Sequence, residues 1–156
     1  EIGYYAFYGC TSLTSIEIPS SVTMIDRNAF DGCTSLTSMV VEEGNSVYDS
    51  REGCNAIIET ATNKLIKGCN STIIPSSVTE ILGGAFWDCT SLKSIVIPES
   101  VEIIQAEAFQ NVTIYCNVEK IPYGWDKDFA LNNCKVYWKG TWEYVDGVPK
   151  PILNEG

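Results

Sequence analysis

The stretch "AFYGCTSLTSIEI" at residues 6–18 is spelled almost unchanged twice more, as "AFDGCTSLTSMVV" at residues 29–41 and as "AFWDCTSLKSIVI" at residues 85–97. With a further pair at Ala108-Phe109, the four Ala-Phe pairs are separated by 23, 56 and 23 residues. The middle interval therefore holds one 23-residue repeat and 33 inserted residues. Repetition at a short fixed period predicts a solenoid, whose coils bury their apolar sides against each other. We expect the four phenylalanines to stack in a single file.

Each repeat contains a short segment with the pattern of a strand. In the first repeat, Ile16 and Ile18 alternate with Glu17, as in a strand with one buried face. Pro19 follows directly and ends the strand, because proline has no N–H to offer a neighbouring strand. A period of 23 residues lies within the range of leucine-rich repeats. The sequence predicts a leucine-rich repeat solenoid of short parallel strands joined by turns or 3-10 segments.

The consensus of the repeats, AFxxCTSLxSIxIPxSVxxI, resembles the BspA-like leucine-rich repeat family of surface proteins. The resemblance covers the repeats in residues 1–112, the insert and the aromatic segment that follows the repeats. It implies a right-handed solenoid that is secreted or displayed at the cell surface of a bacterium. Better-studied members of the family bind host proteins or other cells, and the family brings no catalytic residues.

The charge and composition of the chain exclude several classes of function. Asp and Glu number 20 against 10 Lys and Arg, a net charge of -10, so neither nucleic acid nor an anionic membrane is an expected partner. No apolar run approaches the roughly 18 residues that span a bilayer. The absence of histidine removes Ser-His and Cys-His nucleophile pairs and the commonest neutral metal ligand. We expect a protein that is not an enzyme and uses no cofactor or metal.

The repeat pattern divides the chain into three parts. Residues 1–112 form the solenoid, with a β-hairpin segment inserted at about residues 42–73. The register fails after Phe109, and the aromatic residues within 113–140 predict a C-terminal cap over the last coil. Residues 141–156 have two prolines and no repeat, as expected of a tail or linker. The chain starts inside a repeat, so we expect a monomeric fragment of a longer array.

The cysteines suggest two disulfides. The insert sequence "CNAIIETATNKLIKGC" predicts two strands around a turn near Ala61-Thr62. Cys54 and Cys69 are equally far from that turn and lie opposite each other, either as a disulfide or as two free thiols. Cys116 and Cys134 bracket the cap and form the second possible disulfide. The other three cysteines share one repeat position and are expected to be small buried side chains: Cys10, Cys33 and Cys89.

The insert also gathers acidic residues. Asp49 and Glu52, with Glu42 and Glu43 nearby, carry carboxylates of the kind that bind calcium. The spacing of an EF-hand loop is absent, so a solvated acidic loop is the expected state of this segment.

The outward side chains of the strands are the candidate partner-binding residues. In leucine-rich repeat solenoids this side is concave, and partners usually dock there; an insertion often adds binding surface beside it. Its small hydroxyls and modest apolar area favour binding of a host or microbial protein. The candidate residues are Thr14, Ser15, Glu17, Thr37, Ser38, Val40, Lys93, Ser94 and Val96.

Two other roles stay open. The aromatic cap contains Trp125, Trp138 and Trp142, and clustered aromatic rings are also found in glycan-binding sites. Alternatively, the repeats are a structural spacer that holds another domain away from the cell wall and has no ligand of its own.

Overall fold

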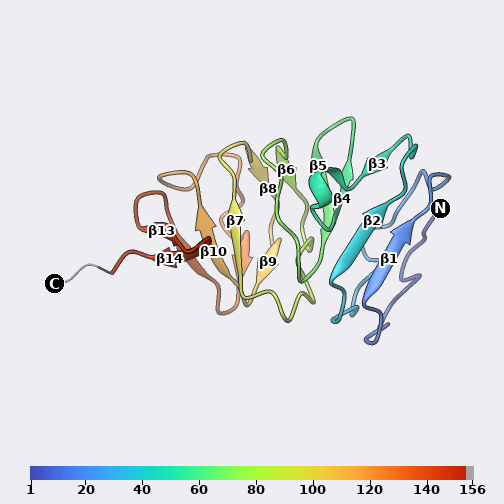
Figure 1. The fold of residues 1–156 in the computed structure, drawn as a ribbon, viewed down its shortest axis with the longest axis horizontal. Coiled ribbons are helices and arrows are strands. Elements are labelled where there is room, and N and C mark those ends of the chain that lie inside the picture. The colour runs from blue at the N-terminus through green and yellow to red at the C-terminus, as the bar shows by residue number, and fades with distance from the viewer. Residues whose placement is uncertain (154–156) are drawn as a thin grey trace.

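The computed structural model describes residues 1–153, which form a solenoid with the N terminus at one end and the C-terminal strands at the other (Figure 1). No helix in this part of the chain is long and apolar enough to cross a membrane. The elements in chain order are β1 (Ser15–Ile18), β2 (Ser38–Val41), β3 (Tyr48–Asp49), a 3-10 turn η1 (Arg51–Gly53), β4 (Ala56–Glu59), β5 (Lys64–Gly68), β6 (Glu80–Ile81), β7 (Ser94–Ile97), β8 (Ile103–Ile104), β9 (Phe109–Gln110), β10 (Thr113–Cys116), β11 (Ala130–Leu131), β12 (Lys135–Tyr137), β13 (Trp142–Val145) and β14 (Val148–Pro151).

Equivalent residues of successive repeats stack in parallel registers. Ile16 of β1 lies beside Met39 of β2, and beyond the insert Ile95 of β7 lies beside Ile114 of β10. A second ladder of parallel pairs runs through β5, β6 and β8. The leucine-rich repeat solenoid predicted from the 23-residue period is therefore confirmed.

The phenylalanines of the Ala-Phe pairs stack ring on ring in the core. The ring centroids of Phe7 and Phe30 lie 5.3 Å apart, and those of Phe86 and Phe109 lie 4.8 Å apart. Both pairs are nearly coplanar, with interplanar angles of 5° and 8°. The expected single file is thus divided into two pairs, one on each side of the insert.

Gly68 of the insert stands in the position of a phenylalanine between the two pairs. Its N–H donates to the Ala85 carbonyl at 2.8 Å, just as the Phe86 N–H donates to the Ala108 carbonyl at 3.0 Å one coil later. A Cβ on Gly68 would lie 2.3 Å from the Phe86 ring. The insert therefore supplies backbone at this rung but leaves the side-chain space to Phe86.

The hairpin of β4 and β5 stands as a wall between the N-terminal and C-terminal coils (Figure 1). Ile58 and Leu65 belong to the core cluster of the C-terminal coils, whereas Ile57 and Ile66 belong to that of the N-terminal coils. All four are at most 8% exposed. Because neighbouring residues of a strand point to opposite faces, the hairpin buries both of its faces. The predicted hairpin insertion is confirmed, and it lies inside the fold.

The insert also divides the strand face of the solenoid. β5 pairs in parallel with β6, which extends one sheet in the order β3-β4-β5-β6-β8. The strands of the predicted binding face form two separate sheets, β1-β2 and β12-β10-β7. β2 and β7 are therefore unpaired with each other, although they flank the same repeat position.

Residues 113–140 continue the solenoid and do not form a separate cap. Ile114 of β10 pairs with Ile95 on one side and with Val136 of β12 on the other, both in parallel. The predicted solenoid boundary at residue 112 is wrong because this coil is shorter, with only 19 residues from Ile95 to Ile114. A fixed 23-residue period misses it.

Residues 142–151 form an antiparallel hairpin where the sequence suggested a linker. The two turn residues, Asp146 and Gly147, have φ angles of 52° and 76°. Two consecutive positive φ angles are typical of a type I′ hairpin turn, for which Asp-Gly is a preferred sequence. Residues 154–156 of the expected tail lie outside the described residues.

Neither suggested disulfide is present, since all seven cysteines are free. The register of β4 and β5 shifts at a bulge between Ile57 and Ile58, so Cys54 and Cys69 are not opposite each other. Cys54 instead packs in the core of the C-terminal coils, and Cys69 in that of the N-terminal coils. A one-residue shift has placed the two thiols on opposite faces of the wall.

The second pair is separated along the strands. Cys116 is the last residue of β10, whereas Cys134 precedes Lys135, the partner of the first residue of β10. An offset of four residues corresponds to about 13 Å along a strand. That distance exceeds the reach of a disulfide, whose Cα atoms lie about 4.4–6.8 Å apart.

We predict that Gly68→Ala lowers the free energy of unfolding by about 1–3 kcal/mol, because the new methyl group overlaps the Phe86 ring. Gly3→Ala is the matched control, since no atom lies within 4 Å of a Cβ at that position. Chemical denaturation measures both. The loss should shrink when Phe86→Leu is present in the same chain, and equal losses for the two glycine variants would contradict the packing at this rung.

We predict that the thiols differ sharply in reactivity. Burial raises the pKa of the Cys89 and Cys116 thiols to about 12, and the thiolate is the reactive form, whereas Cys10 is exposed. Ellman's reagent at pH 8 should label Cys10 quickly in the native protein and all seven thiols in denaturant. Fewer than seven labelled thiols in denaturant without reductant would show that a disulfide had formed.

Candidate binding site

The predicted partner-binding side chains are exposed or partly exposed, but they form two strips. The N-terminal strip consists of Thr14, Ser15, Glu17, Thr37, Ser38 and Val40, around β1 and β2. The C-terminal strip consists of Lys93, Ser94 and Val96, at β7. The insert lies between them, so the structure does not join all nine residues into one surface.

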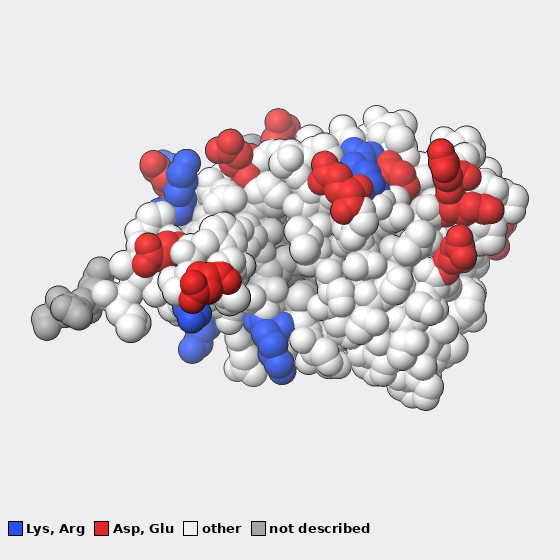
Figure 2. Space-filling model, in the orientation of Figure 1, with Lys and Arg blue, Asp and Glu red and all other residues white. Residues whose placement is uncertain are grey.

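The C-terminal strip is the floor of a groove of about 490 Å³. One wall is the end of the insert, the other is the C-terminal hairpin, and Asn117 lies at the same groove. Figure 2 shows this face hollowed between β7 and the middle of the molecule. The lining residues are Thr72, Ile73, Ile74 and Ser76 from the insert, Ser94, Ile95, Val96 and Pro98 at β7, Asn117, and Tyr144, Gly147 and Pro149 from the hairpin.

The groove is uncharged although the protein is strongly acidic. None of its lining residues is Asp, Glu, Lys or Arg. Figure 2 shows acidic side chains along the upper edge and at the N-terminal end of the same face, while its middle carries none. Two large apolar or aromatic side chains are unusually open here, Ile73 at 77% and Tyr144 at 58% exposure. An exposed apolar groove of this kind marks a candidate docking site.

Trp142 holds the hairpin wall in place. Its indole N–H donates to the Cys116 carbonyl at 3.0 Å, and its ring lies 5.3 Å from that of Tyr115 on β10. Tyr115 in turn stacks on Tyr137 of β12 at 5.3 Å. The hairpin thus covers the outward face of β10, and Tyr144 beside Trp142 stays open to the groove.

The tryptophans named for a glycan site are largely internal. Trp125 is 4% exposed and its indole N–H donates to the Val101 carbonyl at 3.0 Å, while Trp142 is 8% exposed. Trp138 packs 6.1 Å from Trp125 and is partly buried. A sugar ring needs an open aromatic face, which Trp125 and Trp142 do not offer.

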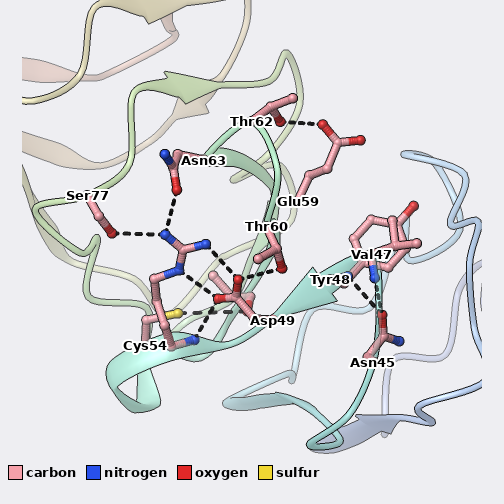
Figure 3. A network of polar contacts seen from close by, with 12 residues as sticks. Asn45, Val47, Tyr48, Asp49, Cys54, Glu59, Thr60, Thr62, Asn63 and Ser77 are labelled. Carbon is pink, nitrogen blue, oxygen red and sulfur yellow. Dashed lines mark hydrogen bonds and ion pairs between the residues drawn. The ribbon is translucent and has the colours of Figure 1, made fainter.

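A network around Arg51 fixes the insert wall (Figure 3). Its guanidinium contacts the Asp49 carboxylate at 2.6 Å and donates to Asn63 Oδ1 at 2.6 Å and to Ser77 Oγ at 3.1 Å. Thr60 also donates to Asp49, at 2.7 Å. The network ties the turn of the hairpin to the loop that follows Ile74 and Pro75. Because Asp49 is committed to Arg51, the carboxylates of this segment are not arranged for calcium.

The same network sets the titration of Asp49. Partial burial by itself would raise the pKa of this carboxyl, but the hydrogen bonds from Arg51 and Thr60 lower it and prevail. The pKa of Asp49 therefore lies below its ordinary value of 3.8.

Ile73 is held in its exposed position by the backbone of the insert. Its N–H donates to the Cys54 carbonyl at 3.1 Å, and the neighbouring Thr72 hydroxyl donates to the Asn55 carbonyl at 2.6 Å. Ile73 was not among the predicted site residues. Alignment of "IIPSSVT" with "EIPSSVT" places it level with Glu17, an outward position, and that register was a usable signal.

The chain was compared with known proteins. A family model described as the BspA type leucine rich repeat region matches residues 1–124 in six copies. This match extends beyond residue 112, in agreement with the continued coils of the structure. No curated protein matches the chain.

Two solved structures are similar. One is the pneumococcal vaccine antigen PcpA, at 16% sequence identity and a TM-score of 0.52, over 81% of this chain and 46% of that chain. The other is a leucine rich cell surface protein from Faecalibacterium prausnitzii A2-165, at 25% identity and a TM-score of 0.39, over 85% of this chain and 50% of that one. The chain spans about half the length of each of them, and the first likeness supports the fold.

We predict that Asp49→Asn destabilises the protein in a pH-dependent way. Because the folded-state pKa of Asp49 is lowered, its carboxylate stabilises the fold above about pH 4, and that contribution is lost as the pH falls through the folded pKa. Urea unfolding should show a loss of about 1–3 kcal/mol at pH 7 and a smaller one at pH 3. The exposed Glu43→Gln is the control. An equal loss at both pH values would argue against the ionised pair.

Proposed function

Because the chain belongs to the BspA type leucine-rich repeat family, we propose that it is a non-catalytic recognition module of a secreted or surface-displayed protein. In this proposal the module binds a host or microbial protein through the groove between β7, the insert and the C-terminal hairpin. Localisation at the cell surface is supported by the family and is part of the proposal.

The observation that carries the proposal is the open apolar groove itself. Ile73 and Tyr144 project from opposite walls, and each exposes more than half of its side chain to water. Both walls are anchored, one by Arg51 and the other by Trp142. A pre-formed groove with apolar anchors loses little conformational entropy when a partner binds.

The groove chemistry favours a polypeptide over other partners. Its hydroxyl and amide groups, from Thr72, Ser76, Ser94 and Asn117, are neutral and stand beside apolar side chains. The net charge of -10 opposes phosphate backbones and anionic lipid. We accordingly propose a protein partner, with no role for nucleic acid, and a monomeric module.

The proposal is tested by a binding screen of the purified chain against extracellular matrix proteins and bacterial surface preparations. We predict that at least one partner binds and that Ile73→Asp combined with Tyr144→Ala weakens it at least tenfold. Val40→Asp on the N-terminal strip is the matched control, because Val40 is also exposed (42%) but lies outside the groove.

Each outcome decides between roles. Loss of binding with Val40→Asp alone would move the site to the N-terminal strip. Complete absence of binding across the screen would contradict the proposal and favour the structural spacer.

A further inference from the structure

β7 is an edge strand in the middle of a solenoid. It is the last strand of the sheet β12-β10-β7, and β2 is the last strand of the other sheet. In an uninterrupted array a strand of the intervening repeat would lie between them. The groove occupies the β7 side of this position.

The repeat does contain residues for that strand, but the insert engages their polar groups. By register with "IPSSVT", residues 71–74 correspond to β1 at Ser15–Ile18. The Ile73 N–H bonds to the Cys54 carbonyl, and the Thr72 hydroxyl bonds to the Asn55 carbonyl. Residues 71–74 consequently have no strand conformation and do not pair with β7.

The backbone of β7 is left with polar groups that face the groove. On its paired side, the Lys93 and Ile97 carbonyls accept hydrogen bonds from the Thr113 and Asn117 N–H groups, at 3.1 and 3.0 Å. Alternate residues of a parallel strand bond to opposite neighbours. The N–H and C=O groups of Ser94 and Val96 therefore point away from β10. Among the hydrogen bonds of residues 1–153, none joins these groups to the insert.

From this arrangement we propose that the groove binds an extended polypeptide segment of the partner, which pairs with the free edge of β7 as an added strand. The inference rests on the proposed function and specifies what the partner presents. Alternating N–H and C=O groups at Ser94 and Val96 are matched by another main chain. Affinity comes from these backbone hydrogen bonds, and the walls select the side chains.

The walls define the chemistry of the bound segment. Side chains that enter the groove meet Ile73, Ile74 and Tyr144, so they are apolar or small and uncharged. Glu99 follows directly after Pro98 at the end of β7 and is exposed. Together with the acidity of the chain, it favours a segment flanked by Lys or Arg.

Val96→Pro tests the added strand. Proline removes the N–H that faces the groove, and an edge strand tolerates it because the bonds to β10 come from the neighbouring residues. Val96→Thr keeps the N–H and is the matched control. Thermal melts establish that both variants fold. The probes are linear 12-residue peptides selected from a random phage-displayed library on the wild-type chain.

We predict that selected peptides bind the Val96→Pro variant at least tenfold more weakly than the Val96→Thr variant. N-methylation of alternate peptide amides should abolish binding, and peptide binding should slow hydrogen exchange of the Ser94 and Val96 amides. Equal affinity for both variants, harmless N-methylation at every position, or a library that yields no binder would overturn the inference.

The two proposals fail differently. If a protein partner from the screen loses binding with Ile73→Asp but retains it with Val96→Pro, the groove is the site and strand addition is wrong. If neither protein nor peptide binds, the proposed function fails as well.

Discussion

The structure depends on one hairpin that is buried on both faces. Ile58 and Leu65 complete the core of the C-terminal coils, and Ile57 and Ile66 complete that of the N-terminal coils. Lys67 on β5 adds a polar link, since its ammonium donates to the Gly84 and Trp87 carbonyls at 3.3 Å while its side chain is 3% exposed in total. Without this hairpin, two short stacks of coils would each expose an apolar end.

The same insertion creates the candidate site. A hairpin that replaces a regular coil supplies Gly68 in place of a phenylalanine and draws residues 71–74 away from β7. The strand face is thereby interrupted, and a groove opens beside a free strand edge. Free edges invite unwanted pairing; here Tyr144 and Ile73 stand on either side of the edge and restrict access to it. Stability and recognition are therefore two consequences of one irregularity in the repeat.

The sequence predicted what is periodic and missed what is not. The pairings of Ile16 with Met39 and of Ile81 with Ile104 follow from the repeat alignment alone. The bulge at Ile57 and Ile58 has no such signal, because it arises from packing two faces at once. The C-terminal hairpin had a local signal in Asp146-Gly147 that the proline content obscured. The groove joins segments about 20 to 50 residues apart along the chain, so its existence needed the fold.

Native-state hydrogen exchange tests most directly whether the hairpin makes the two sets of coils one cooperative unit. The account predicts that core amides of β2 and β7 share one opening free energy. It also predicts that Ile57→Ala, which removes packing only on the N-terminal side, lowers both by the same amount, about 2–4 kcal/mol. If that substitution accelerates exchange in β1 and β2 but leaves β7 and β10 unchanged, the halves open independently and the account is contradicted.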